Sequence, residues 1–137
     1  MINTSREELR RSRNRQEQTA ADINEPMTRR MLLFYAVECG AKYQYMERNN
    51  YRMYSEVPET YRNNKHDIKK LLKELGMESK CSFPIVQSKH NQNIEPGQYQ
   101  EMWRYGVNCE DAEEKGKIIE ENMRKALELL HDMEIRR

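Results

Sequence analysis

The stretch that decides the fold is Met31–Met46, MLLFYAVECGAKYQYM, the densest apolar run of an otherwise polar chain. At helical spacing its apolar side chains cover nearly the whole circumference, which is typical of a helix buried at the centre of a domain. Asn24 and Pro26 precede the run and Asn49 follows it, and these residues favour helix ends. We therefore predict one long central helix from about Pro26 to Asn49, too polar in its second half to span a membrane.

The predicted central helix contains a charged pair and a run of small residues. Glu38 lies among apolar neighbours, and a buried carboxylate is costly unless it is paired. Lys42 follows one helical turn later, so we expect the two side chains to form a structural ion pair that fixes helix packing. The small residues of the Cys39–Ala41 run allow another backbone to come close at the same level.

The composition predicts one domain with a thin core. The chain has 137 residues, and Leu, Ile, Val and Phe make up about 17% of it, although nine Met and eight Tyr supply further apolar surface. A thin core favours oligomerisation, because a partner supplies the missing burial. Twenty-four basic residues balance 23 acidic ones, which argues against a strongly basic nucleic-acid-binding protein but leaves local basic patches open.

The cysteine pattern predicts a reducing, cytoplasmic location. Cys39, Cys81 and Cys109 form no CxxC pair, their number is odd, and no signal peptide or membrane segment is evident. The three His show no HxxxH or HExxH spacing, and no Gly-rich phosphate loop is present. We therefore expect no disulfide framework, no metal site and no cofactor.

The remaining sequence predicts an all-α architecture. Residues 1–25 form a polar, Arg-rich arm or first helix, with a possible capping box from Thr4 to Glu7, and residues 26–137 form a helical bundle. A short helix beginning near Asn64 ends at Gly76, and a long amphipathic helix follows Asn108 to the end of the chain. No strand pattern competes, so we expect a bundle of antiparallel helices.

Several polar residues are candidates for a functional site. Arg62 and His66 place a cation and an imidazole just before the short helix, the residue types that a metal-independent ribonuclease needs on the phosphate and near the 2′-hydroxyl. Arg104 lies beside aromatic residues, where it can stack or hold a phosphate. The set of candidate contacts to RNA or a partner protein is Arg10, Arg11, Lys69, Lys70, Trp103, Arg104 and Tyr105. For each group, solvated surface or ordinary packing is the competing interpretation.

Three short strings resemble the HEPN-domain family (higher eukaryotes and prokaryotes nucleotide-binding). Tyr35–Lys42, YAVECGAK, is similar to the second helix of its members. His66–Leu72, HDIKKLL, and Trp103–Tyr105, WRY, are similar to two later segments of one bacterial branch and occur in the same order. The resemblance implies a HEPN-like antiparallel bundle of four to five helices, working as a homodimer or with a neighbour-encoded protein.

The resemblance also implies a function, although one motif is missing. Many relatives are metal-independent ribonucleases of toxin–antitoxin and antiviral defence systems, with an Arg-x4-6-His motif near the start of the last helix. Here no His follows Arg104 until His131, and the nearest approximation, Arg62 to His66, lies in another element. The catalytic residues of the family therefore cannot be transferred to this chain.

Three functional hypotheses follow. The first is a non-catalytic HEPN-like module that binds RNA or a partner protein in a bacterial defence or toxin–antitoxin system. The second is a metal-independent endoribonuclease that uses Arg62 and His66, or Arg104. The third is a scaffold subunit of a larger defence or nucleotidyltransferase complex, docked through its Arg-rich arm.

Overall fold

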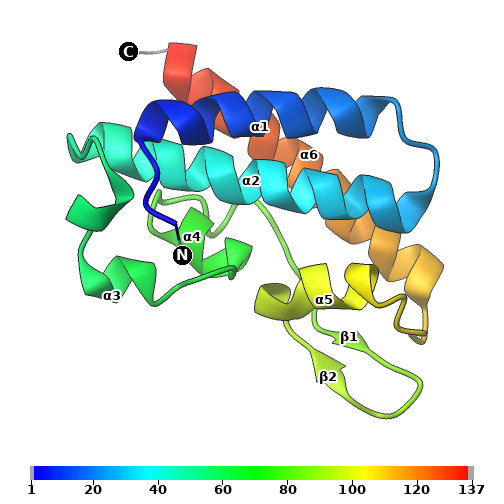
Figure 1. Cartoon of the computed structure of the whole chain (residues 1–137). Coiled ribbons are helices and arrows are strands. Elements are labelled where there is room, and N and C mark those ends of the chain that lie inside the picture. The colour runs from blue at the N-terminus through cyan, green and yellow to red at the C-terminus, as the bar shows by residue number, and fades with distance from the viewer. Residues whose placement is uncertain (1, 136–137) are drawn as a thin grey trace.

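The computed structural model describes residues 2–135, and within this range the chain is mostly helical. Three long helices lie against one another, and the shorter elements gather below them (Figure 1). The α-helices are α1 (Arg6–Ala21), α2 (Pro26–Arg48), α3 (Glu59–Arg62), α4 (Ile68–Lys73), α5 (Tyr99–Arg104) and α6 (Ala112–Ile135). Single 3-10 turns occur at Tyr54–Glu56 and Pro96–Gln98. None of the helices described is long and apolar enough to cross a membrane.

The central helix α2 is buried, as its composition predicts. Leu33, Phe34, Ala36 and Val37 are nearly inaccessible to solvent. Pro26 occupies the first turn, but the side chain that caps this end is Glu25 rather than Asn24, because its carboxylate accepts from the amides of the first turn. The helix ends at Arg48, next to the predicted Asn49.

Helix α1 packs along α2 rather than extending into solvent (Figure 1). Its capping box lies one residue later than predicted: Ser5 and Glu8 exchange side-chain and backbone hydrogen bonds, because Ser5 is the last residue with extended backbone. The small residue Gly40 admits a side chain of α1, and a Cβ there would lie 2.9 Å from Cδ of Arg13. The guanidinium of Arg13 is buried and pairs with Glu134 at 2.9 Å.

Helix α6 runs in the same direction as α2, and the expectation of an antiparallel pair is wrong. Near the start of both helices, Glu120 pairs with Arg29 and Arg30, each at 2.9 Å. Near their ends, Arg48 reaches Met133. Contacts from start to start and from end to end show that the two helices run in the same direction. The chain can do this because the long connection between α2 and α6 returns to the side where α2 began (Figure 1). Helix α1 runs opposite to both.

The connection between residues 49 and 111 holds more structure than its sequence indicates. β1 (Val86–Gln87) and β2 (Asn93–Ile94) form an antiparallel hairpin, which corrects the expectation that no strand is present. Each strand has only two residues, too few to show a period of two in the sequence. Helix α5 follows, and the aromatic ring of Trp103 packs edge-on against Phe34 of α2.

Helix α4 is shorter than the predicted helix. Asp67 rather than Asn64 caps it, since the Asp67 carboxylate accepts from the amide of Lys70. Gly76 follows the helix with φ of +76°, a left-handed conformation that glycine adopts without a steric penalty. The predicted stop at Gly76 is therefore present, and α4 buries Ile68, Leu71 and Leu72 against α2.

Candidate functional site

The candidate site is built around a carboxylate on the central helix. Glu38 and Lys42 lie one turn apart on α2, and Nζ of Lys42 donates to Oε2 of Glu38 at 2.8 Å. Both side chains are buried. A buried charge without a partner is strongly destabilising, and in this pair each charge compensates the other. The ammonium of Lys42 also lies 5.3 Å from the centre of the Tyr54 ring, within the range of a cation–π contact.

The same carboxylate oxygen binds a residue from a distant part of the chain. Nδ1 of His66 lies 2.8 Å from Oε2 of Glu38. Because an ionised carboxylate only accepts hydrogen bonds, Nδ1 must carry the hydrogen, and in the neutral ring Nε2 is then the basic nitrogen. The side chain of His66 is 52% exposed, so the imidazole is anchored at one end and open to solvent.

These contacts keep Glu38 ionised in spite of its burial. Burial by itself acts to raise the pKa of Glu38. The hydrogen bond from His66 and the nearby charge and hydrogen bond of Lys42 outweigh that effect and hold the pKa below its ordinary value. The carboxylate is therefore negative at neutral pH and orients the imidazole.

A tight turn delivers His66 to this position. The chain leaves α3 at Arg62, and the amide of Lys65 donates to the Arg62 carbonyl at 3.1 Å. Lys65 has φ of +50°, a left-handed conformation that costs about 1–3 kcal/mol for a residue with a Cβ. Asp67 then caps α4. The strained turn places Arg62, Lys65 and His66 on the same side of the chain, where they line one pocket.

These residues open onto one pocket, which we call the cation pocket, with a volume of about 580 Å³. Its lining residues are Ile2, Asn3, Lys42, Tyr54, Ser55, Arg62, Lys65 and His66. The N-terminal segment forms one wall, because the amide of Tyr54 donates to the Thr4 carbonyl at 2.8 Å and the amide of Ser55 donates to Oδ1 of Asn3 at 2.9 Å.

The cation pocket has an excess of positive charge. Lys42, Arg62 and Lys65 carry permanent charges, and among the described residues Glu38 is the one carboxylate that forms an ion pair with any of the three. Among residues 2–135, neither Arg62 nor Lys65 forms an ion pair with a carboxylate. The pocket therefore suits a small anionic group better than a neutral or cationic one.

The residues of the WRY string separate into core and surface. Trp103 is only 6% exposed and packs among the rings of α2 and α5, so it is mainly a core residue. Arg104 is exposed, and its Nη2 donates to the hydroxyl of Tyr35 at 2.8 Å. Tyr105 is 68% exposed. Arg104 and Tyr105 lie outside the cation pocket.

The other candidate contacts lie on two separate surfaces. Arg10 pairs with Glu7 and Glu134, so its charge is already compensated, whereas its neighbour Arg11 is exposed on α1. Lys69 and Lys70 are exposed on α4, outside the cation pocket. The structure thus brings together Arg62, His66 and the Glu38–Lys42 pair, but not the remaining candidates.

Tyr54 and Lys65 line the pocket but were not among the candidate site residues. Tyr54 has no helical or strand pattern around it, and only the chain fold places its ring over Lys42. Lys65 directly precedes the candidate His66, and this position in the sequence could have indicated that Lys65 belongs to the same site. Within the described part of the chain, no cluster of His, Cys, Asp or Glu is arranged to hold a metal ion.

Comparisons with protein-family models, with curated proteins and with solved structures give no match to this chain.

The buried ion pair of Glu38 and Lys42 should contribute to the stability of the fold. Glu38→Gln should lower the free energy of unfolding by about 3 kcal/mol, because it leaves the Lys42 ammonium buried without a carboxylate. The double variant Glu38→Gln with Lys42→Met should recover part of that loss, since it removes both charges. Urea unfolding followed by circular dichroism measures both values. A Glu38→Gln loss within about 0.5 kcal/mol, the range of ordinary surface substitutions, would show that the pair is not structurally important.

Proposed function

We propose that the protein binds RNA, with a phosphate of the RNA backbone held in the cation pocket. The observation that carries this proposal is the convergence of Lys42, Arg62, Lys65 and His66 on one open pocket, in which two of the cations have no carboxylate partner among the described residues. Phosphate contacts from Lys and Arg supply most of the sequence-independent affinity for nucleic acid.

The chemistry of the pocket suits a phosphate group. Arg62 offers a planar fork that matches two phosphate oxygens, and Lys65 supplies a second, mobile point charge. The ring of Tyr54 is buried under the ammonium of Lys42, so the groups that the pocket offers to a ligand are the exposed cations Arg62 and Lys65 and the imidazole of His66. Because the whole chain is almost neutral, binding depends on this local cluster and not on a general positive field.

The HEPN resemblance supports the same function, and we propose a HEPN-like bundle that works as a homodimer or with a neighbour-encoded protein in bacterial defence. The second and third of the strings that carry the resemblance each contact the first. His66 of the second string binds Glu38 of the first, and Arg104 of the third binds Tyr35 of the first. Residues far apart in sequence are expected to meet in this way if they belong to one ancestral site.

RNA binding should depend on the two unpaired cations. The double variant Arg62→Gln with Lys65→Gln should weaken binding of a labelled single-stranded RNA by roughly tenfold near 0.1 M salt. It should also reduce the slope of log K against log salt by about 1.4, since each contact to a single strand contributes about 0.7. Fluorescence anisotropy over a range of salt concentrations gives both quantities.

The matched control for this experiment is Lys69→Gln with Lys70→Gln. It removes the same charge from the exposed surface of α4 and should have a clearly smaller effect. Equal losses in the two double variants, or no binding by the unaltered protein, would contradict a phosphate site in the cation pocket. Normal RNA affinity in the Arg62 and Lys65 variant would do the same.

The Glu38–His66 contact favours a second candidate function, metal-independent RNA cleavage. With Nδ1 bound to the carboxylate, Nε2 of His66 is the nitrogen that accepts a proton. It would take the proton of a 2′-hydroxyl, whose oxygen attacks the adjacent phosphorus and expels the 5′-oxygen, which takes a proton from solvent. Arg62 would stabilise the charge that develops on the phosphoryl oxygens. The products are a 2′,3′-cyclic phosphate and a 5′-hydroxyl.

Cleavage can be tested with His66→Ala in EDTA. If the protein is a ribonuclease, total RNA and tRNA should be cut by the unaltered protein, and His66→Ala should lower the rate by about 100-fold or more, as for the loss of a general base. The matched control is His131→Ala, because His131 also contacts a carboxylate, that of Glu17 at 2.8 Å, but lies between α1 and α6. RNA that is bound and left intact would exclude this candidate and leave the binding function.

A further inference from the structure

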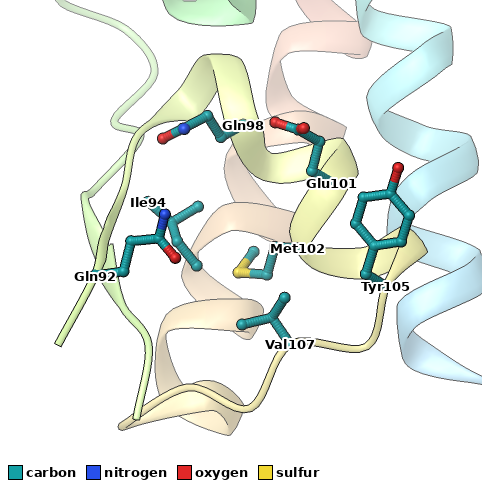
Figure 2. A pocket seen from close by; sticks show the side chains of 7 residues that line it. All are labelled: Gln92, Ile94, Gln98, Glu101, Met102, Tyr105 and Val107. Carbon is teal, nitrogen blue, oxygen red and sulfur yellow. The ribbon is translucent and has the colours of Figure 1, made fainter. Parts of the chain in front are cut away.

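A second pocket lies between the β-hairpin and helix α5, and we call it the hairpin pocket. Its volume is about 230 Å³, below the usual range for drug-sized ligands, so it fits a single ring system. The residues that line it are Gln92, Ile94, Gln98, Glu101, Met102, Tyr105 and Val107. In Figure 2, Gln98 and Glu101 follow one edge, Tyr105 stands opposite Gln92 and Ile94, and Met102 and Val107 lie between them.

The lining of the hairpin pocket combines an apolar floor with an exposed aromatic ring. Ile94 and Met102 are buried and Val107 is half-buried, so the floor offers apolar surface and no charge. Tyr105 is one of the few large apolar side chains that the fold leaves exposed. A planar ring inserted here gains both burial and stacking, which is worth about 1–3 kcal/mol for a nucleobase on an aromatic side chain.

The polar edge of the pocket supplies one acceptor and one donor. Among the described residues, the carboxylate of Glu101 has no hydrogen-bond or ion-pair partner, and it can accept from an amine. Oε1 of Gln98 already accepts from the amide of Glu95 at 3.1 Å, so its NH2 group is the part left to donate. A ligand that fits this edge presents an amine beside an acceptor.

The residue before Tyr105 is a cation, Arg104, which forms no ion pair with a carboxylate among residues 2–135. Its guanidinium donates to the Tyr35 hydroxyl and to Oε1 of Gln100, at 2.8 and 3.3 Å. Hydrogen bonds to the hydroxyls of Tyr35 and Tyr105 raise the pKa of Arg104 further above its ordinary value. These neutral groups fix the guanidinium in place and leave its charge available to an anion.

We propose that the hairpin pocket holds one unpaired base of the bound RNA, selected for an exocyclic amine that Glu101 accepts, with the phosphate of that nucleotide on Arg104. Adenine and cytosine present an amine beside a ring acceptor, and uracil does not. The proposal rests on the RNA-binding function above, because it names the part of the RNA that this second site recognises.

The two pockets lie within reach of one strand. Arg104 is bound by Tyr35 of α2. Glu38 and Lys42, which belong to the site at the cation pocket, follow Tyr35 by three and seven residues, so all three lie on one face of the helix. From Tyr35 to Lys42 the helix rises about 10 Å. A short single-stranded segment therefore spans the distance from Arg104 to the cation pocket.

Mononucleotides are the direct probes of the hairpin pocket, with nuclear magnetic resonance titration of the full chain as the measurement. AMP and CMP should shift the signals of residues 92–107, and UMP should bind at these residues about tenfold more weakly, as for the loss of one hydrogen bond to a charged group. Tyr105→Ala should weaken AMP binding by roughly five- to one-hundredfold, whereas Tyr105→Phe keeps the stacking ring, loses only the hydroxyl beside Arg104 and should keep most of the affinity. Glu101→Gln should remove the preference over UMP, because its amide can also donate.

Three comparisons complete the test. Arg104→Gln should weaken AMP but leave adenosine unchanged, since only the phosphate contact is lost. Glu121→Gln, which removes an exposed carboxylate of α6, is the control for Glu101→Gln and should change nothing. Short oligoadenylate should bind more tightly than oligouridylate, and Glu101→Gln should abolish that difference. Equal binding of AMP and UMP, or AMP binding that survives Tyr105→Ala, would overturn the proposal.

The proposals for the two pockets can be refuted separately. Arg62→Gln with Lys65→Gln should leave AMP binding intact, because those residues lie outside the hairpin pocket. AMP binding with no contribution of Arg62 and Lys65 to RNA affinity would refute the cation pocket alone. RNA affinity that depends on Arg62 and Lys65, with no selectivity among bases, would refute the base site alone.

Discussion

One carboxylate oxygen joins the fold to the candidate site. Oε2 of Glu38 accepts from Lys42 on the same helix and from His66 in the turn before α4. Without these donors the charge could not remain inside an apolar helix, and without the charge neither Lys42 nor the imidazole would be held in position. The need to satisfy one buried charge therefore fixes where the turn from Arg62 to Asp67 lies and aligns its cations on one pocket.

Much of the helical framework could be predicted from local sequence. The run around Phe34 is apolar on every side, so its burial follows from composition, and the spacing of Glu38 and Lys42 predicts their pairing. The stop at Gly76 is also local, because only the backbone of that residue is involved. Arg62 and His66 were recognised as a possible site from their residue types, but nothing local placed them against Glu38.

The parts that escaped prediction depend on contacts over long distances in the chain. The two-residue strands of the hairpin are too short for a periodic pattern, and the common direction of α2 and α6 is set by 63 residues of intervening chain, 49–111. Arg13 belongs to the polar, Arg-rich first segment, yet Gly40 provides the space in which its side chain is buried. Trp103 was a candidate for binding and is used in packing.

The most direct test of this account is the tautomer of His66, observed by long-range proton–nitrogen correlation of the imidazole ring in solution. The account predicts that in the neutral ring Nδ1 carries the hydrogen and Nε2 does not, because the Glu38 carboxylate accepts from Nδ1. In Glu38→Ala, which leaves no acceptor at this position, the preference should disappear, and the ring should show the exchanging mixture of a free histidine. A neutral His66 with its hydrogen on Nε2 in the unaltered protein would contradict the central role of Glu38.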